Sequence, residues 1–574
     1  MALPSGRDRL ENVGMSHHAH PYSIRNALRA VFREPCSSRP SVSQRRAFHE
    51  YFVTHLPSSS LSPDKQHANH HRLPRDESSP HSGPSRTPAQ LAQQAAVSRD
   101  TTIVRIPIKS AKHHFGAGVS RGSRPYNEDT YQAGTIEMPA FAKRQPVSLT
   151  RTLPGQGGAG GGQSAKSESG DPQVFYFGVF DGHGGSECSD FLRDRLHGYI
   201  EEAALLFGME SSLRSASSVD DTSLDSEGGI MGEQDAEDLQ KSLVTMWRET
   251  VGGYFKRFKP EHFPAVSNNS SADLPSTLNS SSIETVLAYA FLKADLDFTT
   301  AQASKHTNAA RAQSSIDDPV LADRPLNDND VLFQDDRPAS QNLRAPRKGS
   351  SPDLAAPIGG AQRFKGGSTA SVALISTPTP VPFWHPASPS TLIVAHAGDT
   401  RILLSRTSDG KALPLTTNHH PDAPAEANRL RRYAASFVTD SFGEERMGGL
   451  ANTRAFGDIG SKRLGVSAEP QITRVDLAPA EYSFVVMVSD GVSGHLTDQE
   501  IVDVVKEART PAQGAGDLAG FAVEVAEEAD NATALVVRLG GWERRNEGGG
   551  GSLGTKEQRD YRRQEAMDPR ARRQ

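Results

Sequence analysis

Apolar residues recur along the chain with the two spacings that distinguish helices from strands. Spacings of three and four residues predict helices over 186–207, 235–258, 281–297, 423–434, 497–508 and 515–528. Alternating positions or short apolar runs predict strands over 104–108, 174–180, 369–376, 391–397, 401–405, 482–488 and 532–539. Together these elements indicate a globular domain over residues 101–540.

Polar segments of low complexity interrupt this pattern. Residues 57–100 are rich in Ser, Pro and His and read as a disordered linker, and 541–574 read as a disordered tail. Three further segments are predicted to be inserts without a core of their own, at 142–172, 209–234 and 300–362. The glycine-rich run 155–162 lacks a preceding strand and a Lys-Ser/Thr ending, so we interpret it as flexible linker and not as a phosphate loop.

Composition narrows the picture further. At about 150 residues per domain, a chain of 574 residues has room for three or four domains, but only 36% of its residues are hydrophobic, which favours fewer. The net charge of −6, with both signs mixed, gives no indication of nucleic-acid binding. The two cysteines cannot form a disulfide framework, and no apolar stretch is long enough to span a bilayer.

Residues 12–33 contain no acidic residue and have an amphipathic pattern. Apolar residues follow helical spacing, while Arg25, Arg29 and Arg33 recur every four residues. This pattern is typical of a mitochondrial presequence, although an ordinary amphipathic helix in a disordered tail is the alternative. We therefore predict a presequence region at 1–56 and a mitochondrial location, in the matrix or intermembrane space, with the cytoplasm as the alternative. The absence of an apolar signal-peptide segment argues against a secreted hydrolase.

The predicted strand 174–180 ends in an unusual polar motif, Asp181-Gly182-His183-Gly184-Gly185. Glycine permits a sharp turn and a close approach of the backbone to an ion. A carboxylate and an imidazole fixed at the end of a buried strand are well placed for chemistry. The alternative is an ordinary polar turn, because Asp-Gly is a common turn sequence.

Other predicted strands also end at acidic residues. Asp399 follows the strand 391–397, Asp490 follows 482–488, and Asp530 precedes 532–539. Upstream, Arg124 lies four residues before the pair Glu128-Asp129. Each of these is compatible with a simple turn or a charged edge. Together they repeat one arrangement, in which a strand ends at an acidic residue beside a glycine bend.

The residue types suggest a particular chemistry. Carboxylate oxygens are ligands that suit Mg²⁺ or Mn²⁺, and no Cys/His cluster with zinc spacing is present in the sequence. Clustered carboxylates repel one another unless cations neutralise them. Two close divalent ions can activate a water held between them for displacement at phosphorus. Arg124 suits the role of phosphate anchor and His183 that of proton donor to the leaving oxygen.

In this order, these residues resemble the type 2C, metal-dependent (PPM) family of protein Ser/Thr phosphatases, over roughly residues 115–540. The matching motifs are Ser123-Arg124-Pro125-Tyr126-Asn127-Glu128-Asp129, Val179-Phe180-Asp181-Gly182-His183-Gly184-Gly185, Gly367-Ser368-Thr369-Ala370, Ala397-Gly398-Asp399-Thr400-Arg401, Leu450-Ala451-Asn452-Thr453-Arg454-Ala455-Phe456-Gly457-Asp458, Val466-Ser467-Ala468-Glu469-Pro470, Ser489-Asp490-Gly491 and Asp530-Asn531-Ala532-Thr533. Together with the N-terminal pattern, the domain resembles the fungal mitochondrial branch of that family.

The resemblance implies an α+β fold, an α-β-β-α sandwich of two mainly antiparallel sheets flanked by helices, and a monomer that acts on phosphoproteins. It implies two Mg²⁺ or Mn²⁺ ions bridged by Asp181, with a weaker third. Glu128 and the carbonyl of Gly182 would complete one metal site, and Asp490 with Asp530 the other. The remaining implied roles are Asp399 at the third metal, Arg124 on the phosphate, His183 as general acid, Asp129 behind the ligands, and Thr369 and Asn531 as orienting residues.

The sequence departs from the family pattern at a few positions. The family often has an aspartate where Asn418 stands, and a Trp-Asp pair where Ser493-Gly494 stands, which bears on the third metal. Our leading hypothesis is a protein serine/threonine phosphatase that uses a water held between two metal ions. The alternative is a catalytically weak pseudophosphatase that acts as a binding or regulatory module. That alternative requires a lost ligand, and the four core acids are all present.

Overall fold

The computed structural model describes thirteen parts of the chain. They are residues 51–57, 101–107, 114–144, 163–164, 171–213, 233–266, 281–305, 358–360, 362–431, 437–439, 445–447, 449–545 and 551–568. The predicted presequence helix, the linker from residue 58 to 100 and most of the three inserts lie outside these residues.

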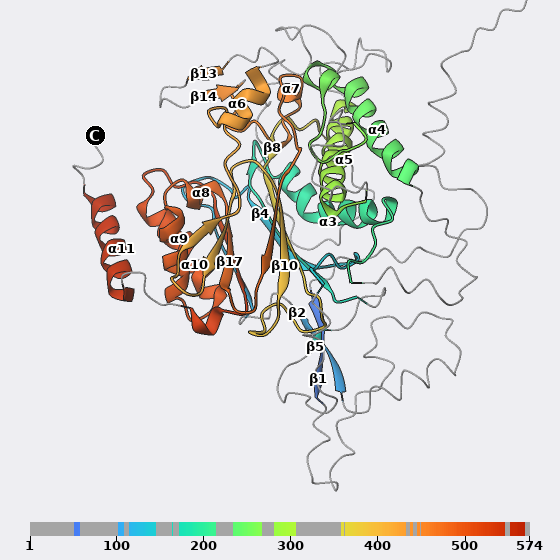
Figure 1. The fold of residues 1–574 in the computed structure, drawn as a ribbon. Helices are drawn as coiled ribbons and strands as arrows, with labels where there is room; N and C mark the ends of the chain where they lie inside the picture. The colour runs from blue at the N-terminus through green and yellow to red at the C-terminus, as the bar shows by residue number, and fades with distance from the viewer. Residues whose placement is uncertain are drawn as a thin grey trace, which may run out of the picture. The chain divides into compact units, whose positions relative to one another are not determined.

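Two five-stranded antiparallel sheets form the centre of the fold (Figure 1). The strands of the first, in spatial order, are β16 (Gln471–Leu477), β10 (Ser390–Ala397), β9 (Ala370–Ser376), β6 (Val174–Phe180) and β4 (Thr130–Ile136). The strands of the second are β12 (Ala412–Pro414), β11 (Arg401–Arg406), β17 (Tyr482–Val488), β18 (Ala532–Arg538) and β3 (Phe115–Ser120). The strands predicted over these ranges are confirmed, whereas β3, β4, β12 and β16 were missed.

The side chains of β6 show how the sheets are layered. This strand is buried along its whole length, as its continuous apolar run predicts. Phe175, Phe177 and Val179 point into the core between the two sheets, which they share with Ile402 and Met487 of the second sheet. The intervening Tyr176 and Phe180 point the other way, into the core beneath the helices, because successive side chains of a strand face opposite sides.

Helices cover the outer face of each sheet. Helices α3 (Glu187–Leu206), α4 (Glu233–Thr250) and α5 (Ile283–Ala303) share a core with the first sheet, and α9 (Asp498–Glu507) and α10 (Pro511–Val525) share one with the second. Figure 1 shows the three green helices on one side of the strands and the red helices on the other. The predicted sandwich of two antiparallel sheets between helices is therefore confirmed.

Local chemistry explains where two helices depart from prediction. The stretch 235–258, predicted as one helix, breaks after Thr250, and a short 3₁₀ helix η4 (Gly253–Arg257) follows. Gly252 and Gly253 adopt φ values of 68° and 52°, which an α-helix does not contain. Helix α10 begins four residues earlier than predicted because the Thr510 side chain accepts a bond from the Gln513 amide and Pro511 fits the first turn.

Shorter elements connect the layers. They are β7 (Gly182–His183), β8 (Gly367–Ser368), α6 (Pro424–Arg431), β13 (Phe437–Thr439), β14 (Glu445–Met447), β15 (Phe456–Gly457), α7 (Ile459–Lys462), α8 (Asp490–Ser493) and η6 (Trp542–Arg544). Strands β7, β8 and β15 form a small sheet that joins the loop after β6 to a segment far later in the chain.

Two predicted boundaries differ from the structure. Strand β1 (Tyr51–Pro57) lies at the end of the predicted presequence region and pairs with β2 (Thr101–Pro107) and β5 (Gln163–Ser164), the last of which falls in the glycine-rich insert. Helix α11 (Gly551–Met567) lies in the segment 541–574 that was predicted to be a disordered tail. Three arginines of this helix, Arg559, Arg562 and Arg563, form ion pairs with the domain.

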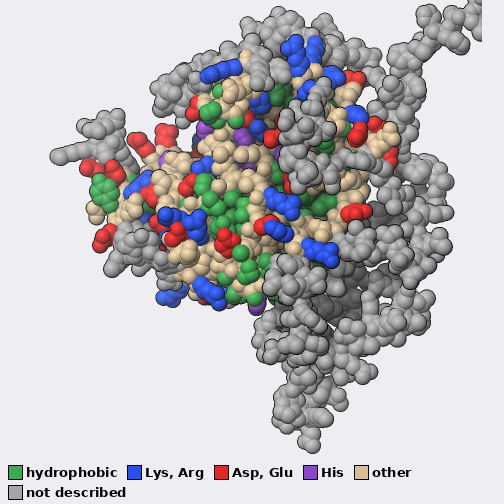
Figure 2. All heavy atoms as spheres, in the orientation of Figure 1, with side chains coloured by type: hydrophobic (Ala, Val, Ile, Leu, Met, Phe, Trp, Pro, Cys, Tyr) green, Lys and Arg blue, Asp and Glu red, His purple; other side chains and the backbone are tan. Residues whose placement is uncertain are grey.

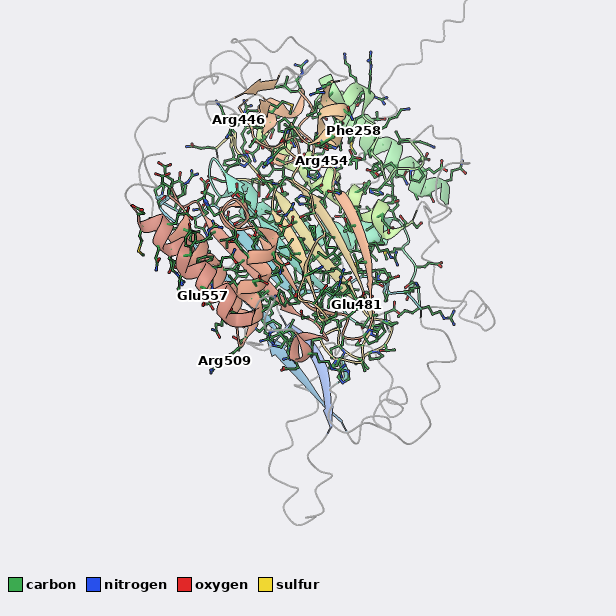
Figure 3. The ribbon with its side chains drawn as sticks, turned by 60° about the vertical axis from the view of Figure 1, so that its left-hand side comes forward. Phe258, Arg446, Arg454, Glu481, Arg509 and Glu557 are labelled. Carbon is green, nitrogen blue, oxygen red and sulfur yellow. The ribbon has the colours of Figure 1, made fainter. Side chains whose placement is uncertain are left out.

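Helix α11 lies beside α9 and α10, and Glu557 marks it in Figure 3. Arg562 donates to Glu500 at 2.8 Å and to the carbonyl of His495 at 2.7 Å. Arg563 pairs with Glu524 at 2.6 Å, and Arg559 pairs with Glu507. The contacts are charged and partly exposed, so they depend on ionic strength.

Removal of residues 546–574 is expected to lower Tm by a few degrees in low salt, because three ion pairs and a bond to a backbone carbonyl are lost. At about 0.5 M NaCl the difference from the full chain is expected to shrink, since salt screens partly exposed pairs. Thermal unfolding at both salt concentrations measures this. Equal Tm values for the two chains in low salt would show that the helix does not stabilise the domain.

The surface carries both charges in alternation. Figure 2 shows Lys and Arg side chains interspersed with Asp and Glu on the visible face, in keeping with the small net charge of −6. Among the residues that the structure describes, none of the helices has the length and apolar character needed to cross a bilayer.

Candidate active site

The site is built on the loop that follows β6. The main-chain carbonyl of Asp181 accepts hydrogen bonds from the amide of Thr369 at 2.8 Å and the hydroxyl of Ser368 at 3.0 Å. In the next two residues, Gly182 pairs with Ser368 and His183 with Gly367. The backbone after β6 is therefore held along β8 and Thr369, which fixes where the Asp181 carboxylate projects.

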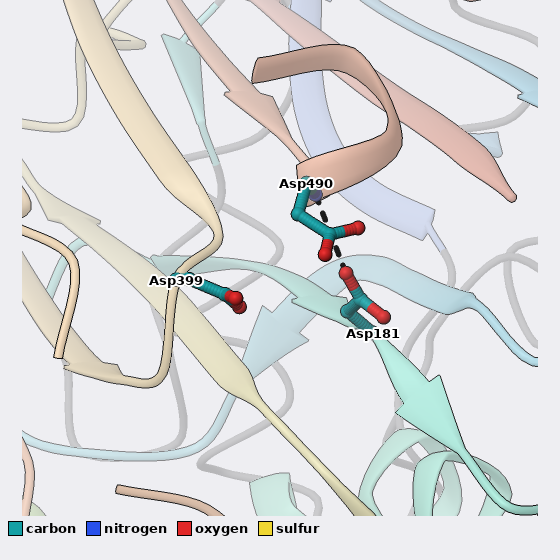
Figure 4. A group of neighbouring side chains, drawn as sticks. All are labelled: Asp181, Asp399 and Asp490. Atoms are coloured by element: carbon teal, nitrogen blue, oxygen red, sulfur yellow. Dashed lines mark hydrogen bonds between the residues drawn. The ribbon is translucent and has the colours of Figure 1, made fainter. Parts of the chain in front are cut away.

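Three acids from three strand ends meet at this loop (Figure 4). Asp181 follows β6, Asp399 follows β10, and Asp490 follows β17 as the first residue of α8. One carboxylate oxygen from each lies within 4.8 Å of the others. The amide of Asp490 also donates to Oδ2 of Asp181 at 3.3 Å.

Burial and mutual repulsion shift the pKa values of these acids. Burial, together with the charges of Asp490, Asp129 and Asp399, raises the pKa of Asp181 well above its usual value. Burial and the charge of Asp399 raise the pKa of Asp490 to about 7. The pKa of Asp399 is lowered despite its burial, because His420 stabilises the carboxylate. Three like charges held this closely call for positive charge among them.

This arrangement fits divalent cations. The donor set consists of carboxylate oxygens, which suit Mg²⁺ and Mn²⁺. Asp399 is 6% exposed, yet its Oδ1 finds no hydrogen-bond donor among the described residues. A buried oxygen without a donor next to two other carboxylates is what a cation would satisfy.

Glu128 and Asp530 lie at the edge of this trio. Oε1 of Glu128 accepts from the Gly185 amide at 2.7 Å, which fastens the side chain to the glycine turn after His183. Oδ1 of Asp530 accepts from the amide of Asn531 at 2.7 Å. The charge of Asp530 acts on both Asp490 and Asp129, so it lies near the cluster.

Three of the predicted metal ligands form this tight group, and two others lie outside it. Asp399, expected at a separate third metal, groups with Asp181 and Asp490, whereas Glu128 and Asp530 do not belong to that tight group. Gly182 is buried, and a side chain there would collide with the Glu128 carbonyl, at 2.5 Å from the added carbon. Its backbone is thus packed against the Glu128 main chain.

Arg124 lies beside the acids, as the sequence predicts for a phosphate anchor. Its NH2 group pairs with Oδ2 of Asp530 at 2.6 Å, and the side chain is 59% exposed. Asn531 holds the same loop, because its Oδ1 accepts from the Glu128 amide at 2.7 Å and its Nδ2 donates to the Tyr126 carbonyl at 3.1 Å. An exposed guanidinium at the rim of an acid cluster can receive an anionic group from solvent.

Asp129 and Thr369 are both buried next to the acid cluster. Asp129 is buried, and burial raises its pKa to about 6. The amide of Thr369 holds the Asp181 carbonyl, so this residue orients the backbone of the site. The orienting roles that the resemblance implies for both residues stay predictions.

Sequence reasoning missed two partners of the site. Nε2 of His183 lies 2.9 Å from Oδ1 of Asp458, and the negative charge of Asp458 raises the pKa of His183 even though burial opposes this. Nε2 of His420 lies 3.4 Å from Oδ2 of Asp399. Asp458 is the last residue of the motif 450–458 that carries the family resemblance, so the sequence offered a signal for it. Nothing in the sequence connects His420 with Asp399.

A buried ion pair holds the backbone just before Asp458. Lys462 and Asp295 are both fully buried and lie 2.5 Å apart. Asp295 also accepts from the Gly457 amide at 2.9 Å, and Lys462 donates to the Ala455 carbonyl at 2.8 Å. Helix α5 thereby anchors the turn that carries Asp458.

The chain is similar to known protein phosphatases. The family model for Protein phosphatase 2C matches residues 309–534. Protein phosphatase 2C homolog 4 of Schizosaccharomyces pombe is 30% identical over 445 residues, which cover 77% of this chain and 84% of the relative. Protein phosphatase 1K, mitochondrial, of Xenopus laevis is 37% identical over 152 residues, 26% of this chain and 40% of the relative.

Among solved structures, serine-threonine phosphatase 2C from Toxoplasma gondii aligns with 74% of this chain and 94% of its own, at 16% identity and a TM-score of 0.38. The family assignment does not depend on that alignment. It rests on the fission yeast relative, which is matched over most of both chains. The chain therefore belongs to the protein phosphatase 2C family of protein serine/threonine phosphatases.

Proposed function

We propose that this protein hydrolyses phosphoserine and phosphothreonine in protein substrates, by attack of a metal-activated water. The observation that carries the proposal is the convergence of Asp181, Asp399 and Asp490 beside a histidine and an exposed arginine. Acids alone would repel an anionic phosphate, so the reaction requires cations, and the carboxylate donor set suits Mg²⁺ or Mn²⁺.

Each side chain then has a distinct task. Asp181, Asp399 and Asp490 would hold divalent cations, with Glu128, Asp530 and the carbonyl of Gly182 as the further ligands that the family resemblance implies. When bound, such cations lower the pKa of water and neutralise charge on phosphate oxygens.

The chain supplies the remaining groups. Arg124 binds the phosphate oxygens through its planar fork of donors. His183, whose pKa is raised by Asp458, carries a proton at neutral pH more readily than an ordinary histidine does. It gives this proton to the leaving oxygen of the serine or threonine side chain.

A direct assay tests the proposal. The purified full chain is expected to hydrolyse p-nitrophenyl phosphate and a phosphoserine peptide with Mg²⁺ or Mn²⁺, and EDTA is expected to abolish both activities. Hydrolysis that persists in EDTA would contradict the metal-dependent mechanism. A metal-loaded protein that binds the phosphopeptide without turning it over would instead favour a pseudophosphatase.

Replacement of Arg124 by alanine is expected to lower kcat/KM for the peptide by about 10- to 100-fold, mainly through KM, because a charged pair to the phosphate is lost. Steady-state kinetics at saturating metal measure this. Lys143→Ala is the control, since Lys143 is another exposed cation and pairs with Asp476 near the far end of β10. An unchanged KM in Arg124→Ala would remove Arg124 from the binding site.

We also propose a mitochondrial location. The acid-free amphipathic pattern over 12–33 supports it, and one relative, matched over 152 residues, is named as mitochondrial. Residues 1–60 fused to a fluorescent reporter are expected to enter mitochondria. A cytosolic reporter would overturn this part without affecting the proposed activity.

A further inference from the structure

The ring of His183 is held by a carboxylate from a distant part of the chain. Its Nε2 lies 2.9 Å from Oδ1 and 3.0 Å from Oδ2 of Asp458. The Asp458 side chain is only 4% exposed, whereas that of His183 is 38% exposed. Contact of one ring nitrogen with both carboxylate oxygens leaves Nδ1 as the nitrogen able to face a substrate.

The backbone of Asp458 has an uncommon conformation. Its φ is 45° and its ψ is 50°, and only one other non-glycine residue in the described parts of the chain has positive φ. Short polar residues such as Asp tolerate this left-handed conformation better than most side chains do. The Asp458 amide donates to the Gly366 carbonyl at 3.0 Å, which ties the turn to the segment before β8.

Two further contacts fix where the carboxylate points. The preceding Gly457, with φ of 72°, donates to the buried Asp295 of the ion pair with Lys462. On the other side, a Cβ atom at Gly367 would lie 2.3 Å from Oδ2 of Asp458, so the carboxylate fits only because residue 367 has no side chain. Gly367 is also the residue that pairs with His183 in the small sheet.

We propose that Asp458 is a positioning residue for the phosphatase reaction, which accepts the Nε2 proton of His183 in a hydrogen bond and so presents Nδ1 to the leaving oxygen. This inference rests on the proposed function. Neither the main-chain hydrogen bonds of the turn nor the core pair beneath it requires a carboxylate at position 458. The geometry instead directs that carboxylate at the imidazole of His183.

The reaction balances without a further reagent. The bond between phosphorus and the serine or threonine oxygen breaks, and the proton on Nδ1 of His183 passes to that oxygen. Water contributes its oxygen to phosphorus, and one of its protons restores the charge of the imidazole. Asp458 gains and loses nothing, and its contribution is to hold the ring during the transfer.

Leaving groups of different basicity separate this role from a structural one. An alkoxide needs a proton as it leaves, whereas p-nitrophenolate is a stable anion and needs little help. Asp458→Asn is therefore expected to lower kcat for a phosphoserine peptide by about 10- to 100-fold and kcat for p-nitrophenyl phosphate by less than about 3-fold. Asp458→Gly is expected to show the same losses as Asp458→Asn. Asn and Gly both tolerate the left-handed backbone at position 458.

Further variants complete the test. Asp297→Asn, which removes a carboxylate paired with Lys293 on helix α5, is the matched control and is expected to leave both activities unchanged. In His183→Gln, addition of Asp458→Asn is expected to cause no further loss, because the two residues act as one unit. Circular dichroism and thermal unfolding establish that each variant is folded.

The outcomes are distinct. Equal losses on both substrates, or additive losses in the double variant, would overturn the positioning role of Asp458. A wild-type chain that hydrolyses neither substrate with Mn²⁺ would instead overturn the proposed function itself. Full activity of folded Asp458→Asn on the phosphopeptide would also overturn the inference.

Discussion

Asp181→Asn is expected to lower kcat/KM for a phosphoserine peptide by at least about 10³-fold, since several kcal/mol of transition-state stabilisation depend on the cations that Asp181 would hold. Asparagine keeps the shape of the side chain and an oxygen that can accept from the Asp490 amide. The negative charge that would attract a cation to Asp399 and Asp490 is lost. Single-turnover kinetics at saturating Mn²⁺ measure the effect on the chemical step.

Asp476→Asn is the control for this variant. Asp476 is also a carboxylate at the edge of the first sheet, but it contacts Thr391 at the start of β10, away from Asp399 at its other end. The control is expected to retain normal activity. Full activity of Asp181→Asn would remove Asp181 from the metal site.

Asp295→Ala is expected to lower the free energy of unfolding by about 3 to 5 kcal/mol, because the fully buried Lys462 would be left without its charge partner. Loss of the bond to the Gly457 amide adds to this cost. Urea denaturation of the wild-type and variant proteins measures the difference.

Two comparisons isolate the buried charge as the cause. Glu237→Ala breaks an exposed pair with Lys241 on α4 and is expected to leave the denaturation midpoint unchanged. Asp295→Leu combined with Lys462→Met is expected to recover much of the loss, since it removes both charges. A double variant as unstable as Asp295→Ala would show that the unpaired ammonium is not what destabilises the protein.

Most of the fold follows from periodicity. Strand β6 was predicted from its continuous apolar run, and α9 from helical spacing with a Thr497–Glu500 capping box at its start. The missed strand β16 is an edge strand with several partly exposed residues, so it lacks a clean apolar signal. Helix α11 was missed because it is held by ion pairs and not by an apolar face.

The candidate site was only partly predictable. The rule that strand ends carry acids identified Asp181, Asp399 and Asp490, because a strand end fixes where its next residue lies. The grouping within 4.8 Å could not be read from the sequence, since it depends on how the two sheets pack. The contact between His183 and Asp458 joins residues 275 positions apart and depends on a left-handed turn that the sequence does not specify.

The central claim is that the converging carboxylates hold divalent cations, and direct measurement of Mn²⁺ binding tests it. Isothermal titration calorimetry, with electron paramagnetic resonance of free Mn²⁺, is expected to detect the two sites that the family resemblance implies in the wild-type protein. Both are expected to weaken at least about tenfold in Asp181→Asn and to persist in Asp476→Asn. Equal Mn²⁺ affinity and stoichiometry in the wild-type protein and Asp181→Asn would contradict the account.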